Sequence, residues 1–96
     1  MLTFVARMKV KAGKEQEFIR LAKELTGEVL EHEPDTKLYC FYRLREEDRG
    51  FAVIESFTDD AAEEAHRNTA HFNQLAPALI DCLDGDYVRE YLDPLE

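Results

Sequence analysis

The order of hydrophobic patterns along the chain predicts an α+β fold of the ferredoxin-like type, a βαββαβ sandwich with helices on one face of an antiparallel four-stranded sheet. Three observations carry this prediction. Apolar residues change from a period of two to a helical period and back in that order. A polar loop of hairpin size, residues 45–50, separates the two middle strands. The length of 96 residues suits a single domain, residues 1–96.

The first strand and the first helix have the clearest patterns. Residues 2–10 alternate between apolar and more polar side chains, which is the strand period. After a turn at residues 11–14, an apolar stripe recurs at helical spacing in Phe18, Leu21, Ala22, Leu25 and Val29. Pro34 disfavours helical backbone at Glu33, so the first helix is expected to end near His32.

A hairpin and a short helix follow. Residues 36–44 and 51–57 are rich in aromatic and branched side chains, and we predict two strands there. Thr58 or Asp59 can cap the next helix, because their side chains can accept a hydrogen bond from the first helical turn. That helix is short, since a second cap signal appears at residues 68–69.

The second cap signal predicts a further helix and then a last strand. The apolar stripe of this helix consists of Phe72, Leu75, Leu79 and Leu83. Pro77 lies inside the stripe and should kink the helix or mark a restart. Gly85 ends the helix, residues 86–92 are predicted as a strand, and residues 93–96 form a tail.

The sheet face that the helices leave uncovered is expected to be largely apolar. Its predicted residues are Val5, Arg7, Lys9, Tyr39, Phe41, Arg43, Ala52 and Ile54. This is more apolar surface than a monomer usually leaves in water. The second strand, around residues 38–42, would also be a long unpaired edge. Both features favour a homodimer in which two sheets pack face to face.

Composition and charge exclude several function classes. The chain has 21 acidic and 12 basic residues, and the net charge of −9 argues against nucleic acid or an anionic membrane as a partner. No apolar run is long enough to span a bilayer, and the first residues lack the pattern of a signal peptide. Cys40 and Cys82 match no metal or redox spacing, so we expect free thiols and a cytoplasmic location.

Glu55 is the first candidate for a catalytic role. It shares a strand face with Phe51, Val53 and Phe57, which is the face expected to point at the helices. A carboxyl group in that position must have a partner or a raised pKa. Two interpretations stay open: a buried ion pair or helix-end contact, and a catalytic or substrate-orienting group.

His66 and His71 bracket the break between the last two helices and are candidates for a general base. Each could instead cap a helix end or bond a backbone carbonyl, and we expect both to be partly exposed. They lie five residues apart across a break, so they lack the i, i+4 geometry of a helical zinc pair, and no metal site is predicted. Ionisable groups beside large apolar residues are typical of a small-molecule site.

Aromatic residues are expected to line any cavity between the sheet and the helices. Those that we assign to substrate contact are Tyr39, Tyr42, Phe57 and Phe72. The more usual alternative is that such residues belong to the core or to a subunit interface. The sequence has no glycine-rich phosphate loop for flavin or nicotinamide, so no cofactor is predicted.

Several motifs resemble the antibiotic biosynthesis monooxygenase (ABM) domain family. They are Lys11-Ala12-Gly13-Lys14-Glu15, Glu33-Pro34, Tyr39-x-x-Tyr42-Arg43, Phe51-x-Val53-x-Glu55-x-Phe57-x-Asp59 and His66-x-x-Thr69-x-His71-Phe72. The likeness covers nearly the whole chain and implies a dimeric α/β barrel made of two ferredoxin-like subunits. The chain departs from many members at Phe57, where they have Trp, and at Ala70, where they have Pro. The absence of any Trp weighs against the haem-degrading branch.

The resemblance implies a cofactor-independent monooxygenase or quinol oxidase that acts with O2 on a small phenolic, quinol or otherwise enolisable substrate. His66 or His71 would be the base, and Glu55 would orient it. The Tyr39 hydroxyl would hold the oxygen anion. Two alternatives stay open. One is an isomerase or tautomerase that moves protons without oxygen, and the other is a non-catalytic module that binds a small ligand.

Overall fold

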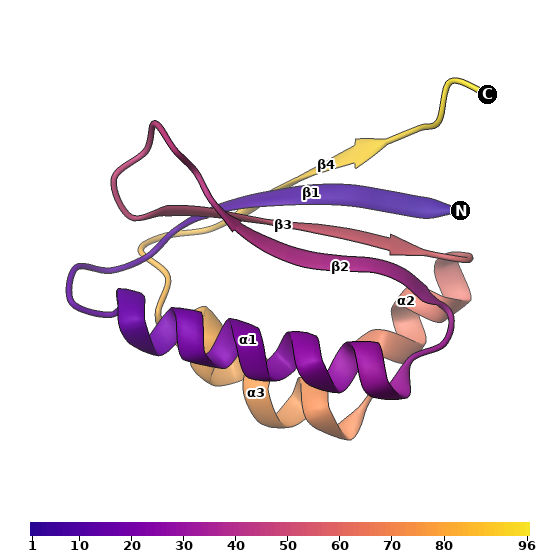
Figure 1. Ribbon diagram of the computed structural model, residues 1–96, viewed down its shortest axis with the longest axis horizontal. Helices are drawn as coiled ribbons and strands as arrows, with labels where there is room; N and C mark the ends of the chain where they lie inside the picture. Colours follow the sequence, from indigo (N-terminus) through magenta and orange to yellow (C-terminus); the bar gives the residue numbers. More distant parts are fainter.

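The computed structural model describes all 96 residues. Its elements are β1 (Leu2–Lys9), α1 (Glu15–His32), β2 (Thr36–Arg43), β3 (Gly50–Phe57), α2 (Asp60–Arg67), α3 (Ala70–Asp81) and β4 (Val88–Leu92). The strands form one antiparallel sheet in the order β2-β3-β1-β4. Figure 1 shows the three helices on one side of this sheet, with α1 and α3 side by side. The predicted ferredoxin-like fold is confirmed, and its last helical segment is divided into α2 and α3.

The helix ends follow the capping signals in the sequence. α1 ends at His32, directly before the Glu33-Pro34 pair, as predicted. The side chain of Asp59 accepts a hydrogen bond from the Ala62 N–H at the start of α2. Thr69 accepts one from Phe72 at the start of α3. α3 runs through Pro77 without a break, so the helix restarts at the Thr69 cap and not at the proline. No helix is long and apolar enough to cross a membrane.

The core fills the space between the helices and the inner face of the sheet, which is the face that points at them. A cluster of 17 buried apolar residues lies there. α1 contributes its whole predicted stripe to this cluster: Phe18, Leu21, Ala22, Leu25 and Val29. The cluster leaves a space near the end of α2, where polar side chains replace apolar ones.

The faces of β2 differ from the prediction. Tyr39, Phe41 and Arg43 pair with Glu55, Val53 and Phe51, and therefore lie on the inner face instead of the uncovered one. The cause is an irregularity between Thr36 and Leu38, where β2 has one residue more than β3. Because side chains alternate along a strand, one extra residue reverses the face of every residue that follows.

The outer face of the sheet is still largely apolar, with different residues from β2. Its apolar residues are Val5, Leu38, Cys40, Tyr42, Ala52, Ile54, Val88 and Leu92, and its polar residues are Thr3, Arg7, Lys9, Ser56 and Glu90. Figure 1 shows no helix over this face. β2 and β4 are its edge strands, and each has one unpaired side.

Leu21→Ala should lower the free energy of unfolding by about 2–5 kcal/mol, because it removes buried methyl groups and leaves a cavity. Leu21 is 5% exposed, whereas Leu30 on the same helix is 64% exposed. Leu30→Ala is therefore the matched control and should change the stability by no more than about 0.5 kcal/mol. Urea denaturation followed by circular dichroism measures both. Equal losses of stability in the two variants would contradict the assignment of Leu21 to the buried stripe of α1.

Candidate active site

A cavity of about 70 Å³ lies between the inner face of the sheet and the helices α2 and α3. Most of its lining is apolar, and its polar lining residues are Tyr39, Glu55, His66, Arg67, Tyr87 and Arg89. This volume holds several water molecules, but it is smaller than the roughly 300–1,000 Å³ of a typical pocket for a larger ligand. The site therefore suits a small molecule.

His66 is the central polar residue of this cavity. It lies in the last turn of α2 and is 2% exposed, so the expectation of a partly exposed ring was wrong. Its ring packs against those of Tyr39, Phe57 and Phe72, with centroids 5.3, 5.3 and 5.0 Å away. Nδ1 lies 2.9 Å from Glu33 Oε1, and Nε2 lies 3.8 Å from Glu55 Oε1. The two ring nitrogens thus face two different carboxyl groups.

Glu33 joins the two histidines and was not predicted as a site residue. Its carboxylate accepts hydrogen bonds from Thr36 at 2.7 Å, from His66 and from His71 at 2.5 Å. Burial alone would raise the pKa of Glu33, but the hydrogen bonds from His71, Thr36 and His66 outweigh it and lower the pKa below its usual value. Glu33 is therefore ionised at neutral pH.

The pKa of Glu55 is shifted in the opposite direction. Burial raises the pKa of Glu55 to about 8; the charge of Arg89 opposes this, and the charges of Glu63 and Glu33 add to it. The carboxyl group is therefore mostly neutral at pH 7. It lies next to His66 on the cavity wall, where a neutral carboxyl group can donate a proton.

Of the predicted substrate-contact residues, only some lie in the cavity. Tyr39 and Phe72 line the cavity. Phe57 is fully buried behind the His66 ring. Tyr42 is not in the cavity, because it lies on the outer face of the sheet and is 50% exposed. The bulge that turns Tyr39 inward turns Tyr42 outward.

His71 lies on the far side of Glu33 from the cavity. It lines a groove of about 380 Å³ beside α1 and α3, together with Glu24, Glu28, His32, Ala70, Gln74 and Leu75. The three side chains His66, Glu33 and His71 therefore connect the buried cavity with this groove.

Two arginines at the mouth of the cavity were also missed. Arg67 lies 2.7 Å from Glu63, and Arg89 lies 3.7 Å from the same carboxylate oxygen. The Arg89 guanidinium also stacks on Phe4 at 4.3 Å. Because Glu55 is mostly neutral, the two positive charges of Arg67 and Arg89 face a single negative charge, that of Glu63. The mouth is locally cationic in a protein with a net charge of −9.

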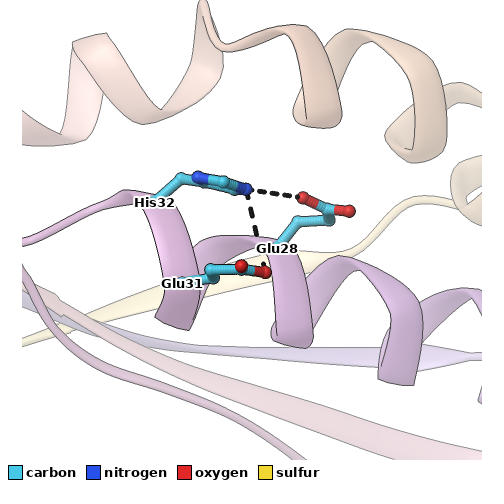
Figure 2. A group of neighbouring side chains, drawn as sticks. All are labelled: Glu28, Glu31 and His32. Carbon is cyan, nitrogen blue, oxygen red and sulfur yellow. Dashed lines mark ion pairs between the residues drawn. The ribbon is translucent and has the colours of Figure 1, made fainter.

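A separate acidic cluster lies on the surface of α1. Figure 2 shows His32 paired with Glu28 at 3.2 Å and with Glu31 at 3.8 Å. These side chains are about half exposed or more and lie outside the cavity. His32 thus lies in the last turn of α1, on the exposed surface of that helix.

The sequence and the fold both match known proteins. Residues 1–78 match the family described as "Antibiotic biosynthesis monooxygenase". The Bacillus subtilis protein named "Putative monooxygenase YcnE" is 33% identical over 72 residues, which are 75% of each chain.

Solved structures give the same result. A "putative antibiotic biosynthesis monooxygenase" from Caulobacter crescentus superposes with a TM-score of 0.92 at 29% identity, over 99% of this chain and 90% of that one. A conserved protein from Methanosarcina mazei gives 0.87 at 30% identity, over 95% and 89%. The chain belongs to the antibiotic biosynthesis monooxygenase family.

Proposed function

We propose that the protein is a cofactor-independent monooxygenase that oxidises a small phenolic, quinol or otherwise enolisable substrate with O2. The observation that carries this proposal is the position of His66. One nitrogen of its buried imidazole is bonded to an ionised carboxylate, and the other faces a mostly apolar cavity. This arrangement is suited to taking a proton from a bound molecule.

The Glu33 carboxylate sets the tautomer of His66. An ionised carboxylate accepts the Nδ1–H bond, which leaves the lone pair of Nε2 directed toward Glu55 and the cavity. Nε2 then removes the substrate hydroxyl proton and forms an electron-rich anion. In monooxygenation this anion supplies the electrons: one oxygen atom enters the substrate, and the other leaves as water.

Hydrogen-bond donors in the cavity support the anion. Burial, together with the charges of Glu55 and Glu33, raises the pKa of Tyr39, so its hydroxyl stays protonated and can donate to an oxygen anion. Arg89 and Arg67 line the same cavity and place positive charge near its mouth. Apolar walls exclude water, which strengthens these interactions.

One observation favours a second candidate function, an isomerase or tautomerase. The mostly neutral Glu55 carboxyl lies beside the His66 base, and such a pair can remove a proton at one position and return one at another. Oxygen uptake with a panel of quinols and phenols separates the two functions. Turnover without oxygen consumption would support the isomerase.

His66→Gln should lower turnover by about 10²–10⁴-fold, because it removes the base. The amide can still donate to Glu33, which limits the loss of stability from leaving that carboxylate unpaired. Oxygen uptake and thermal melting are measured together, with the exposed His32→Gln as the matched control. Unchanged turnover in His66→Gln would refute the assignment of His66 as the base, whereas a wild type that turns over no substrate would favour a binding module.

Glu55→Gln should become more stable relative to the wild type as the pH rises from about 5 to about 8. The pKa of Glu55 in the folded protein is raised to about 8, above its value in the unfolded chain. In this pH window the folded state keeps a proton on Glu55 that the unfolded chain has released. The free energy of unfolding of the wild type therefore falls by at most ~1.4 kcal/mol per pH unit because of this group. Melting temperatures of both proteins across the window measure the difference. A constant difference would show that Glu55 is ionised in the fold.

We also propose that the chain forms a homodimer through the outer face of the sheet. This face is largely apolar and has no helix over it, and a stable interface there should bury more than about 1,200 Å². Ile54→Glu should weaken the dimer, whereas Leu30→Glu on the exposed side of α1 should leave it intact. Sedimentation velocity at micromolar concentration measures both, and a monomeric wild type would refute the proposal.

A further inference from the structure

A continuous path of three side chains leads from the cavity to the groove on the other side of α1 and α3. His66 Nδ1 lies 2.9 Å from Glu33 Oε1, and His71 Nε2 lies 2.5 Å from Glu33 Oε2. His71 lines the groove, so its remaining ring nitrogen is on the side away from Glu33. Each end of the path thus reaches a space that the other end does not.

The burial of His66 makes such a path useful. The imidazole is 2% exposed, so a proton taken up at Nε2 cannot pass directly to bulk water. The cavity's own mouth carries the two guanidinium groups of Arg67 and Arg89, whose positive charges disfavour the passage of a proton. The carboxylate of Glu33 offers a favourable route, because it is negative and is bonded to both imidazoles.

We propose that Glu33 and His71 form a proton relay that carries the proton taken up by His66 to the groove. The proposal rests on the proposed function, in which His66 is the base. In the form that starts the relay, Glu33 is ionised and His71 carries a proton on each ring nitrogen. His66 Nε2 takes the substrate proton, and Nδ1 passes its own proton to Glu33 Oε1. His71 then releases its Nδ1 proton into the groove.

These transfers balance in atoms and charge. They leave the substrate as an anion, the three relay side chains neutral and one proton in the groove. No electron is transferred in the relay itself. The reverse sequence returns a proton to the cavity when the oxidised product or the departing water needs one.

Acidic side chains line the groove beside His71. Glu24 and Glu28 from α1 lie there, and their charges attract a proton that leaves the imidazole. His32 also lies against His71, with ring centroids 6.0 Å apart, but Figure 2 shows that its imidazole is directed to Glu28 and Glu31. His32 is thus a neighbour of the relay and not a member of it.

A purely structural role explains His71 less well. Thr69 already caps α3 by accepting the Phe72 N–H bond, so the helix start does not need the imidazole. Thr36 and His66 already donate hydrogen bonds to Glu33. A third donor that also reaches a solvent groove is what a proton exit requires.

The test measures how fast the His66 Nδ1 proton exchanges with water in the resting protein. The protein is labelled with ¹⁵N-histidine, and the resonance is assigned by its loss in His66→Gln. His71→Gln keeps a donor to Glu33 but cannot release and regain a proton, so exchange should slow by about 10²-fold. His32→Gln is the matched control and should leave the rate unchanged. A structural role for His71 predicts an unchanged or faster exchange in His71→Gln, and that result would overturn the relay.

His71→Leu repeats the measurement with a side chain that fills the space without a hydrogen bond. In a turnover assay, His71→Gln should lower kcat at unchanged KM and increase the solvent deuterium isotope effect. Slow exchange in both variants, without oxidation of any phenol or quinol, would support the relay and refute the oxygenase. Normal exchange and normal kcat in both variants would refute the relay and leave the oxygenase intact.

Discussion

The hydrogen bonds to the Glu33 carboxylate are the interaction on which this end of the molecule depends. Glu33 follows the last residue of α1 and accepts from Thr36 at the start of β2, His66 in α2 and His71 in α3. One side chain therefore ties four elements together at the end of the sandwich where α1 meets α2 (Figure 1). Hydrogen bonds to a charged group contribute about 1.5–3 kcal/mol each, so the contacts that hold these helices also orient the base.

Much of the fold could be predicted from the sequence, because alternation, helical stripes and caps are local signals. The stripe of α1, the end of that helix before Pro34 and the caps at Asp59 and Thr69 all follow from neighbouring residues. The faces of β2 could not be predicted. The extra residue near Lys37 has no mark in the sequence such as a glycine, and only the pairing with β3 reveals it.

The candidate site was predictable only in part, for a similar physical reason. Glu55 and His66 stand out locally, one as a carboxylate on an apolar strand face and the other at a helix break. Glu33 looks like an ordinary exposed acid at a helix end, and its contacts with His66 and His71 span 33 and 38 residues. Arg89 lies on a short last strand whose other residues are exposed. Such groups gain a role only through tertiary contacts.

The bulge before Leu38 determines which side chains of β2 face the cavity and which lie on the outer surface of the sheet. With the extra residue, Tyr39 and Phe41 face the helices, while Cys40 and Tyr42 face outward. Deleting Lys37 would exchange these two sets of side chains along the whole strand, because the faces alternate residue by residue. The extra residue near the start of β2 therefore determines both the lining of the cavity and the outer surface of the sheet. Relatives that differ by one residue there would have diverged in both properties in a single step.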